Sequence, residues 1–160
     1  MDDSNRIAAI EIDDETLAAA GPDAEHERRV AIFDLIEDNY FQVDGENSGP
    51  YNVRLSLQDQ KLVFAIASQN SLPVKTIIMS LMPFKRVIKD YFHICQSYHD
   101  AIRSASPVQI EAIDMGRRGL HNEGSELLEQ RLKDKVTIDF DTSRRLFTLV
   151  CALHQKGGPV

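Results

Sequence analysis

Apolar residues alternate with polar ones in one block of the chain, and longer helical patterns follow that block, which strongly constrains the fold. The alternation covers 53–57 and 62–66, on either side of a polar turn at 58–60. Two such runs predict a hairpin with one buried face. A run at 74–81 is apolar on both faces and predicts a third strand in a central position. A similar alternation predicts another strand at 6–12.

Four segments repeat apolar residues every three or four positions, which predicts helices over 25–39, 84–104, 107–133 and 142–155. A short strand is expected between the last two, over 136–140. The buried stripe expected on the first helix consists of Val30, Phe33, Ile36 and Tyr40. The expected N-caps of the last two helices are Ser106, followed by Pro107, and Asp141.

Three glycines make the continuity of the helix over 107–133 an open question. Gly116, Gly119 and Gly124 lie within nine residues of one another, and each costs about 1 kcal/mol relative to alanine inside a helix. This cost favours a break at 120–124. Apolar residues spaced seven apart across the same region fit one unbroken helix equally well.

Consecutive strands followed by consecutive helices predict an α+β fold, with a mainly antiparallel, meandering sheet packed by three to four helices. A chain of 160 residues is the size of one domain, so we expect a single domain over 1–160. The ends, 1–5 and 156–160, are expected to fray.

Charge and cysteine content narrow the functional class. The chain carries 25 acidic and 18 basic side chains, and its net charge of −7 argues against general nucleic-acid binding. Cys95 and Cys151 lie in apolar helical patterns, so we expect free thiols, no disulfide and a reducing compartment. The chain shows neither a signal-peptide pattern nor an apolar run that spans a membrane, and we expect a cytoplasmic protein.

The segment 114–125 holds the densest cluster of reactive side chains. Arg117 and Arg118 offer guanidinium forks for phosphate or carboxylate, with Asn122 beside them. His121 and Glu123 are the candidate acid–base pair. The alternative is structural: a turn in which the arginines pair with the chain's own acids.

Two basic pairs, Lys85–Arg86 and Arg144–Arg145, fall in the first turn of a predicted helix, where positive charge opposes the helix macrodipole. Either nearby acids such as Asp139 and Asp141 or a bound anion would compensate. Arg144 and Arg145 are therefore further ligand-binding candidates. The histidine and cysteine spacings match no metal-binding motif, so neither a metal nor a cofactor is expected.

Several long strings carry a family resemblance, among them LMPFKRVIKDYFHIC, QIEAIDMGRRGLHNEGSELLEQRL and DFDTSRRLFTLVCALH. They resemble uncharacterised protein family 0262 of the UPF series, which is found in alphaproteobacteria. The similarity extends from about Arg6 to about Gln155. The resemblance implies a bacterial cytosolic protein and supplies no activity and no catalytic residues.

The absence of a recognised catalytic constellation makes a non-catalytic protein the leading hypothesis, one that binds a partner protein or an anionic ligand. The alternative is an enzyme for a phosphorylated or carboxylated small molecule, with Arg117 and Arg118 as clamp and His121 and Glu123 moving protons. A nucleic-acid binder would need the basic pairs to form one stripe. A homodimer stays open.

Overall fold

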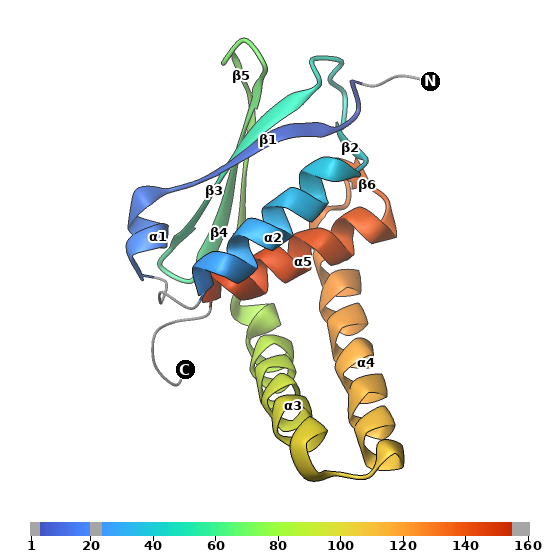
Figure 1. The fold of residues 1–160 in the computed structure, drawn as a ribbon. Helices are drawn as coiled ribbons and strands as arrows, with labels where there is room; N and C mark the ends of the chain where they lie inside the picture. The colour runs from blue at the N-terminus through green and yellow to red at the C-terminus, as the bar shows by residue number, and fades with distance from the viewer. Residues whose placement is uncertain (1–3, 20–23, 155–160) are drawn as a thin grey trace.

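A computed structural model describes residues 4–19 and 24–154 (Figure 1). The expected frayed ends lie outside the described residues, apart from Ser4 and Asn5. In chain order the elements are β1 (Ile7–Ile12), α1 (Asp14–Ala19), α2 (Ala24–Glu37), β2 (Phe41–Val43), β3 (Tyr51–Gln58), β4 (Lys61–Ser68), β5 (Pro73–Ser80), the 3-10 helix η1 (Met82–Phe84), α3 (Lys85–Ser104), α4 (Pro107–Leu132), β6 (Val136–Ile138) and α5 (Phe140–His154).

The predicted α+β class is confirmed. The main sheet has the strand order β1-β3-β4-β5, with β1 parallel to β3 and the other two pairs antiparallel. Asp59 and Gln60 join β3 to β4 with positive φ angles of 50° and 62°. This is the backbone that a two-residue hairpin turn requires. A second, two-stranded sheet pairs β2 with β6. No helix within 4–19 and 24–154 is long and apolar enough to cross a membrane.

The prediction that 74–81 is a central strand is wrong, because β5 is an edge strand of the main sheet. Ile77 and Met79 are buried under the helices, whereas Ile78 lies on the outer face and is 56% exposed. The run is apolar on both sides although only one side is covered. Apolar residues on the open face of the sheet, such as Ile78, gave the same sequence pattern as a strand that is buried on both faces.

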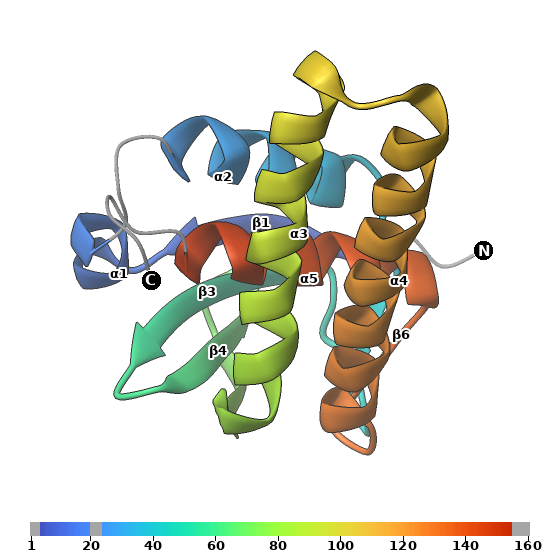
Figure 2. The same cartoon turned by 90° about the horizontal axis from the view of Figure 1, so that it is seen from below.

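The helices form two layers on the same side of the sheet (Figures 1 and 2). α2 and α5 lie side by side beneath it, and the hairpin of α3 and α4 crosses α5 on the far side. α5 is therefore the central helix, with residues from Leu146 to Leu153 buried except Thr148. Asp139, and not the predicted Asp141, caps it, because the Asp139 carboxylate accepts a 2.9 Å hydrogen bond from the Thr142 amide.

The predicted stripe of the first helix is wrong for most of its members. α2 buries Ala31 and Leu35, and Ile36 is partly buried against the core, while Val30 is 45% and Phe33 66% exposed. α2 is apolar on more than one face, so its periodicity did not identify the buried one.

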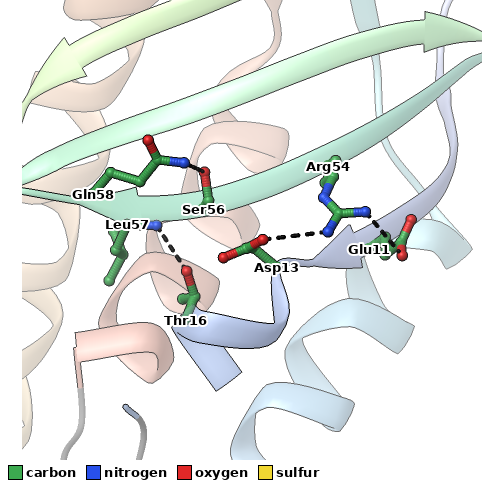
Figure 3. A network of polar contacts seen from close by, with 7 residues as sticks. All are labelled: Glu11, Asp13, Thr16, Arg54, Ser56, Leu57 and Gln58. Carbon is green, nitrogen blue, oxygen red and sulfur yellow. Dashed lines mark hydrogen bonds and ion pairs between the residues drawn. The ribbon is translucent and has the colours of Figure 1, made fainter. Parts of the chain in front are cut away.

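Polar side chains complete the β1 side of the sheet, as Figure 3 shows. Arg54 on β3 reaches Glu11 at 3.3 Å and Asp13 at 3.2 Å. Beyond the end of β1, the Thr16 hydroxyl of α1 accepts a 3.0 Å hydrogen bond from the Leu57 amide. The hydroxyl thus satisfies a β3 amide that β1 is too short to reach.

Of the two alternatives for 107–133, the unbroken helix is the one found, because α4 is continuous from Pro107 to Leu132. It begins as predicted, with Ser106 as N-cap, Pro107 in the first turn and a capping box with Gln109. Gly124 faces α5, and a Cβ atom there would overlap the Phe147 ring. At this position glycine permits a close helix contact and does not end the helix.

Two glycines of α4 give a matched test of this packing. Gly124→Ala places a methyl group inside the Phe147 ring, so we expect it to lower the free energy of unfolding by about 1–3 kcal/mol. At Gly119 nothing lies within 4 Å of the position that a Cβ atom would take, so Gly119→Ala should stabilise the protein by about 1 kcal/mol. Urea denaturation of both variants measures the difference. Equal effects at the two positions would contradict the close contact.

Candidate functional site

A hollow of about 190 Å³ opens between α4 and α5, and α5 supplies most of its lining. The lining residues are His121, Asp141, Arg144, Arg145 and Thr148. Three of them are sequence-predicted candidates: His121, Arg144 and Arg145. Sequence reasoning missed Asp141 and Thr148 as site residues. Asp141 lies three, four and seven residues before Arg144, Arg145 and Thr148. Such spacing puts residues on one helix face, and it was the signal that could have found Asp141 and Thr148.

The two arginines of α5 differ in their partners. Arg145 donates a 3.0 Å hydrogen bond to the Asp38 carbonyl, and its guanidinium lies 4.0 Å from the Asp38 carboxylate. Arg144 is exposed, and within the described residues no carboxylate lies within 4.0 Å of its guanidinium. The α5 amides of Thr142 and Ser143 already donate to Asp139. The free positive charge of this helix end is therefore the Arg144 side chain.

His121 reaches from α4 to α5 at the wall of the hollow. Its Nε2 lies 2.7 Å from the Thr148 hydroxyl, which itself donates to the Arg144 carbonyl. The hydroxyl has a single proton, so both contacts are hydrogen bonds only in the tautomer whose Nε2–H donates to Thr148. This assignment makes Nδ1 the unprotonated nitrogen. The rings of Tyr91 and Phe147 pack edge-on against the imidazole, with centroids 5.4 and 5.2 Å away.

The imidazole of His121 is held in its neutral form. Burial, followed by the positive charges of Arg144 and Arg117, lowers the pKa of His121 from 6.5 to about 4. At neutral pH this side chain is a hydrogen-bonding wall of the hollow. It carries no proton that it can give up as a general acid near pH 7.

Arg117 and Arg118 are both bound to a single acid of their own helix. The Asp114 carboxylate lies 2.6 Å from the Arg117 guanidinium and 2.8 Å from that of Arg118. Arg117 also stacks on Tyr98 of α3, with its Cζ 4.2 Å from the ring centroid. Both arginines thus pair with an acid of the chain itself, as the structural alternative predicted. They do so on a helix and not in the predicted turn.

Glu123 and Asn122 lie apart from the hollow. Glu123 pairs with Arg86 of α3, which also bonds Asp90 at 3.0 Å. The Asn122 Oδ1 atom is buried and accepts no hydrogen bond from the described residues. The enzyme alternative requires the arginine clamp and the pair of His121 and Glu123 to meet at one cavity. The structure does not bring them together.

The remaining candidate chemistries find no assembled site in the described part of the chain. Within 4–19 and 24–154, no group of three or more histidine, cysteine or acidic side chains is placed to hold a metal ion. Both cysteines are free, and burial raises the pKa of Cys151 and of Cys95. Each is therefore a thiol at neutral pH, which is the unreactive form.

Comparison with known proteins identifies the family. The model of Uncharacterised protein family (UPF0262) matches residues 4–156. The chain belongs to UPF0262. No solved structure matches it.

Its UPF0262 relatives are similar over nearly their whole length. The chain is 63% identical to a UPF0262 protein of Hyphomonas neptunium over 155 residues, which covers 97% of this chain and 96% of the relative. It is 60% identical to one of Caulobacter vibrioides over 154 residues, with 96% of each chain covered. A Mesorhizobium japonicum relative is 59% identical over 157 residues, covering 97% of this chain and 98% of its own. The predicted alphaproteobacterial family is confirmed.

The lowered pKa of His121 predicts a pH-dependent stability. The unfolded imidazole takes up a proton as the pH falls below about 6.5, whereas the folded one resists until about 4. The contribution of His121 to the free energy of unfolding is therefore fully present above pH 6.5, and it is lost as the pH falls towards 4. With allowance for solvent screening, we expect a loss on the order of 1–2 kcal/mol.

His121→Gln isolates this contribution, because glutamine keeps a hydrogen-bond donor and does not titrate. Urea denaturation of both proteins between pH 7 and pH 4.5 should show a shallower pH dependence in the variant. An identical pH dependence in the two proteins would show that His121 titrates normally.

Proposed function

We propose that this UPF0262 protein is a non-catalytic binding protein whose hollow between α4 and α5 holds an anionic group, a carboxylate or a phosphate. The observation that carries the proposal is the state of Arg144. The chain has seven more acidic than basic side chains, and Arg86, Arg117, Arg118 and Arg145 all contact its own acids. Arg144 lines a hollow and has no such partner in the described residues.

The charges around the hollow favour an anion. Arg144 and Arg145 outnumber Asp141, and Arg145 lies only at the margin of ion-pair distance from Asp38. Thr148 and the neutral His121 add uncharged polar surface without adding a negative charge. A guanidinium fork can then bind two oxygens of one anionic group.

The size of the hollow indicates how much of a ligand enters it. Pockets that enclose a drug-sized molecule or a cofactor measure roughly 300–1,000 Å³. The hollow, at about 190 Å³, holds a single anionic group and leaves the rest of the ligand outside. This favours an acidic side chain of a partner protein, or the charged end of a small ligand. The free thiols of Cys95 and Cys151 support a reducing compartment such as the cytoplasm.

Inorganic phosphate is the probe for this site, followed by NMR signals of His121 and Thr148. We expect both signals to shift saturably, and Arg144→Glu to weaken binding by at least about tenfold. The matched control is Arg118→Glu, which reverses an exposed arginine that is paired with Asp114. This control should bind as the wild type does.

Two results would refute the proposed site. One is the absence of a saturable shift at His121 and Thr148. The other is an equal loss of binding in both charge-reversal variants, because a general charge effect and not the hollow would then explain the binding. Thermal melting of each variant verifies that it is folded.

A further inference from the structure

β5 is an edge strand of the main sheet, and its segment from Thr76 to Ser80 has neither a charged side chain nor a second partner strand in the described residues. At the other edge, the Asn39 side chain hydrogen-bonds the backbone of Ile7. Its Oδ1 accepts from the Ile7 amide at 2.7 Å, and its Nδ2 donates to the Ile7 carbonyl at 3.1 Å. Glu11 and Arg54 add charges along that side. Such protection is how proteins prevent edge-to-edge pairing. Along β5, the last charged residue is Lys75, and 76–84 carries none.

The direction of the free backbone groups follows from the pairing with β4. Ile77 and Met79 lie opposite Phe64 and Leu62, and the Leu81 amide donates to the Gln60 carbonyl. In an antiparallel ladder the groups facing one neighbour alternate with those facing away. The amides and carbonyls of the intervening residues, Thr76, Ile78 and Ser80, therefore point away from β4.

We propose that β5 pairs antiparallel with β5 of a second copy of this chain, around a twofold axis at Ile78. A twofold axis demands a sequence that is symmetrical in character about its centre. The segment from Thr76 to Ser80 reads hydroxyl, apolar, apolar, apolar, hydroxyl. Thr76 then faces the partner's Ser80, Ile77 faces the partner's Met79, and Ile78 faces its own copy.

Burial and the local absence of charge are the arguments for a second copy as the occupant. Ile78 is 56% exposed, and pairing covers it. Each copy carries a net charge of −7, so two copies repel each other over most of their surfaces. The stretch 76–84 has no charged residue, and this contact brings no like charges face to face.

The dimer is independent of the hollow, because no residue of β5 lines it. The test is light scattering, which measures the solution mass over a range of protein concentrations, together with amide hydrogen exchange. The mass should rise to that of two chains. The amides of Thr76, Ile78 and Ser80 should gain protection as it does, whereas those facing β4 should be protected throughout.

Ile78→Lys places two like charges on the twofold axis and should weaken dimerisation by at least about tenfold. Val108→Lys is the matched control, because Val108 is an exposed apolar residue on α4 that is 77% accessible. A second variant, Ile78→Pro, removes the outward amide without removing a bond to β4. Thermal melting establishes that each variant is folded.

Two outcomes overturn the proposal. A chain that stays monomeric at every concentration has no such dimer. A dimer that survives Ile78→Lys, with the three outward amides still exchanging rapidly, uses a different surface. A dimer disrupted by both β5 variants and kept by Val108→Lys supports the pairing.

Discussion

The Phe147 ring lies directly against the backbone of Gly124, and this contact brings α4 and α5 close together. The residue three positions before Gly124 is His121, and Phe147 is followed at once by Thr148. The short distance between the helices lets the imidazole of His121 bond the Thr148 hydroxyl at 2.7 Å. Arg144, one turn earlier on α5, is left beside the same hollow. A larger side chain at Gly124 would separate all of these groups.

The arginines that the sequence singled out as candidates fall into two groups. Arg117 and Arg118 hold Asp114, and Arg86 joins α3 to α4 through Glu123. The Arg86 pair connects the two helices of the hairpin, whereas the Asp114 pairs lie within α4, and exposed ion pairs contribute only about 0–1 kcal/mol each. Arg144 makes no comparable contact with the described residues, which separates it from the paired arginines. The proposed function rests on that difference and not on the number of basic residues.

The sequence predicted the positions of helices and strands better than it predicted which of their faces are buried. Local signals were sufficient for the β3–β4 hairpin and for the Ser106 cap, because turn and cap chemistry lie within a few residues. Burial depends on distant packing. Phe33 was therefore assigned to the core and is exposed, and β5 was placed inside the sheet that it borders. Similarly, glycine spacing in α4 suggested a break, since the sequence does not reveal that Phe147 lies against Gly124. Arg144 was predicted as a candidate, but its neighbours Asp141 and Thr148 were not.

The ring nitrogens of His121 report most directly on the contact between α4 and α5, on which the geometry of the hollow depends. The ¹⁵N chemical shifts of the imidazole, recorded at pH 6, distinguish its protonated form and its two neutral tautomers. We expect a neutral ring with the proton on Nε2, because that nitrogen donates to Thr148 and the pKa is lowered to about 4. A protonated ring at this pH would contradict the burial of His121 between α4 and α5 and the site built on it.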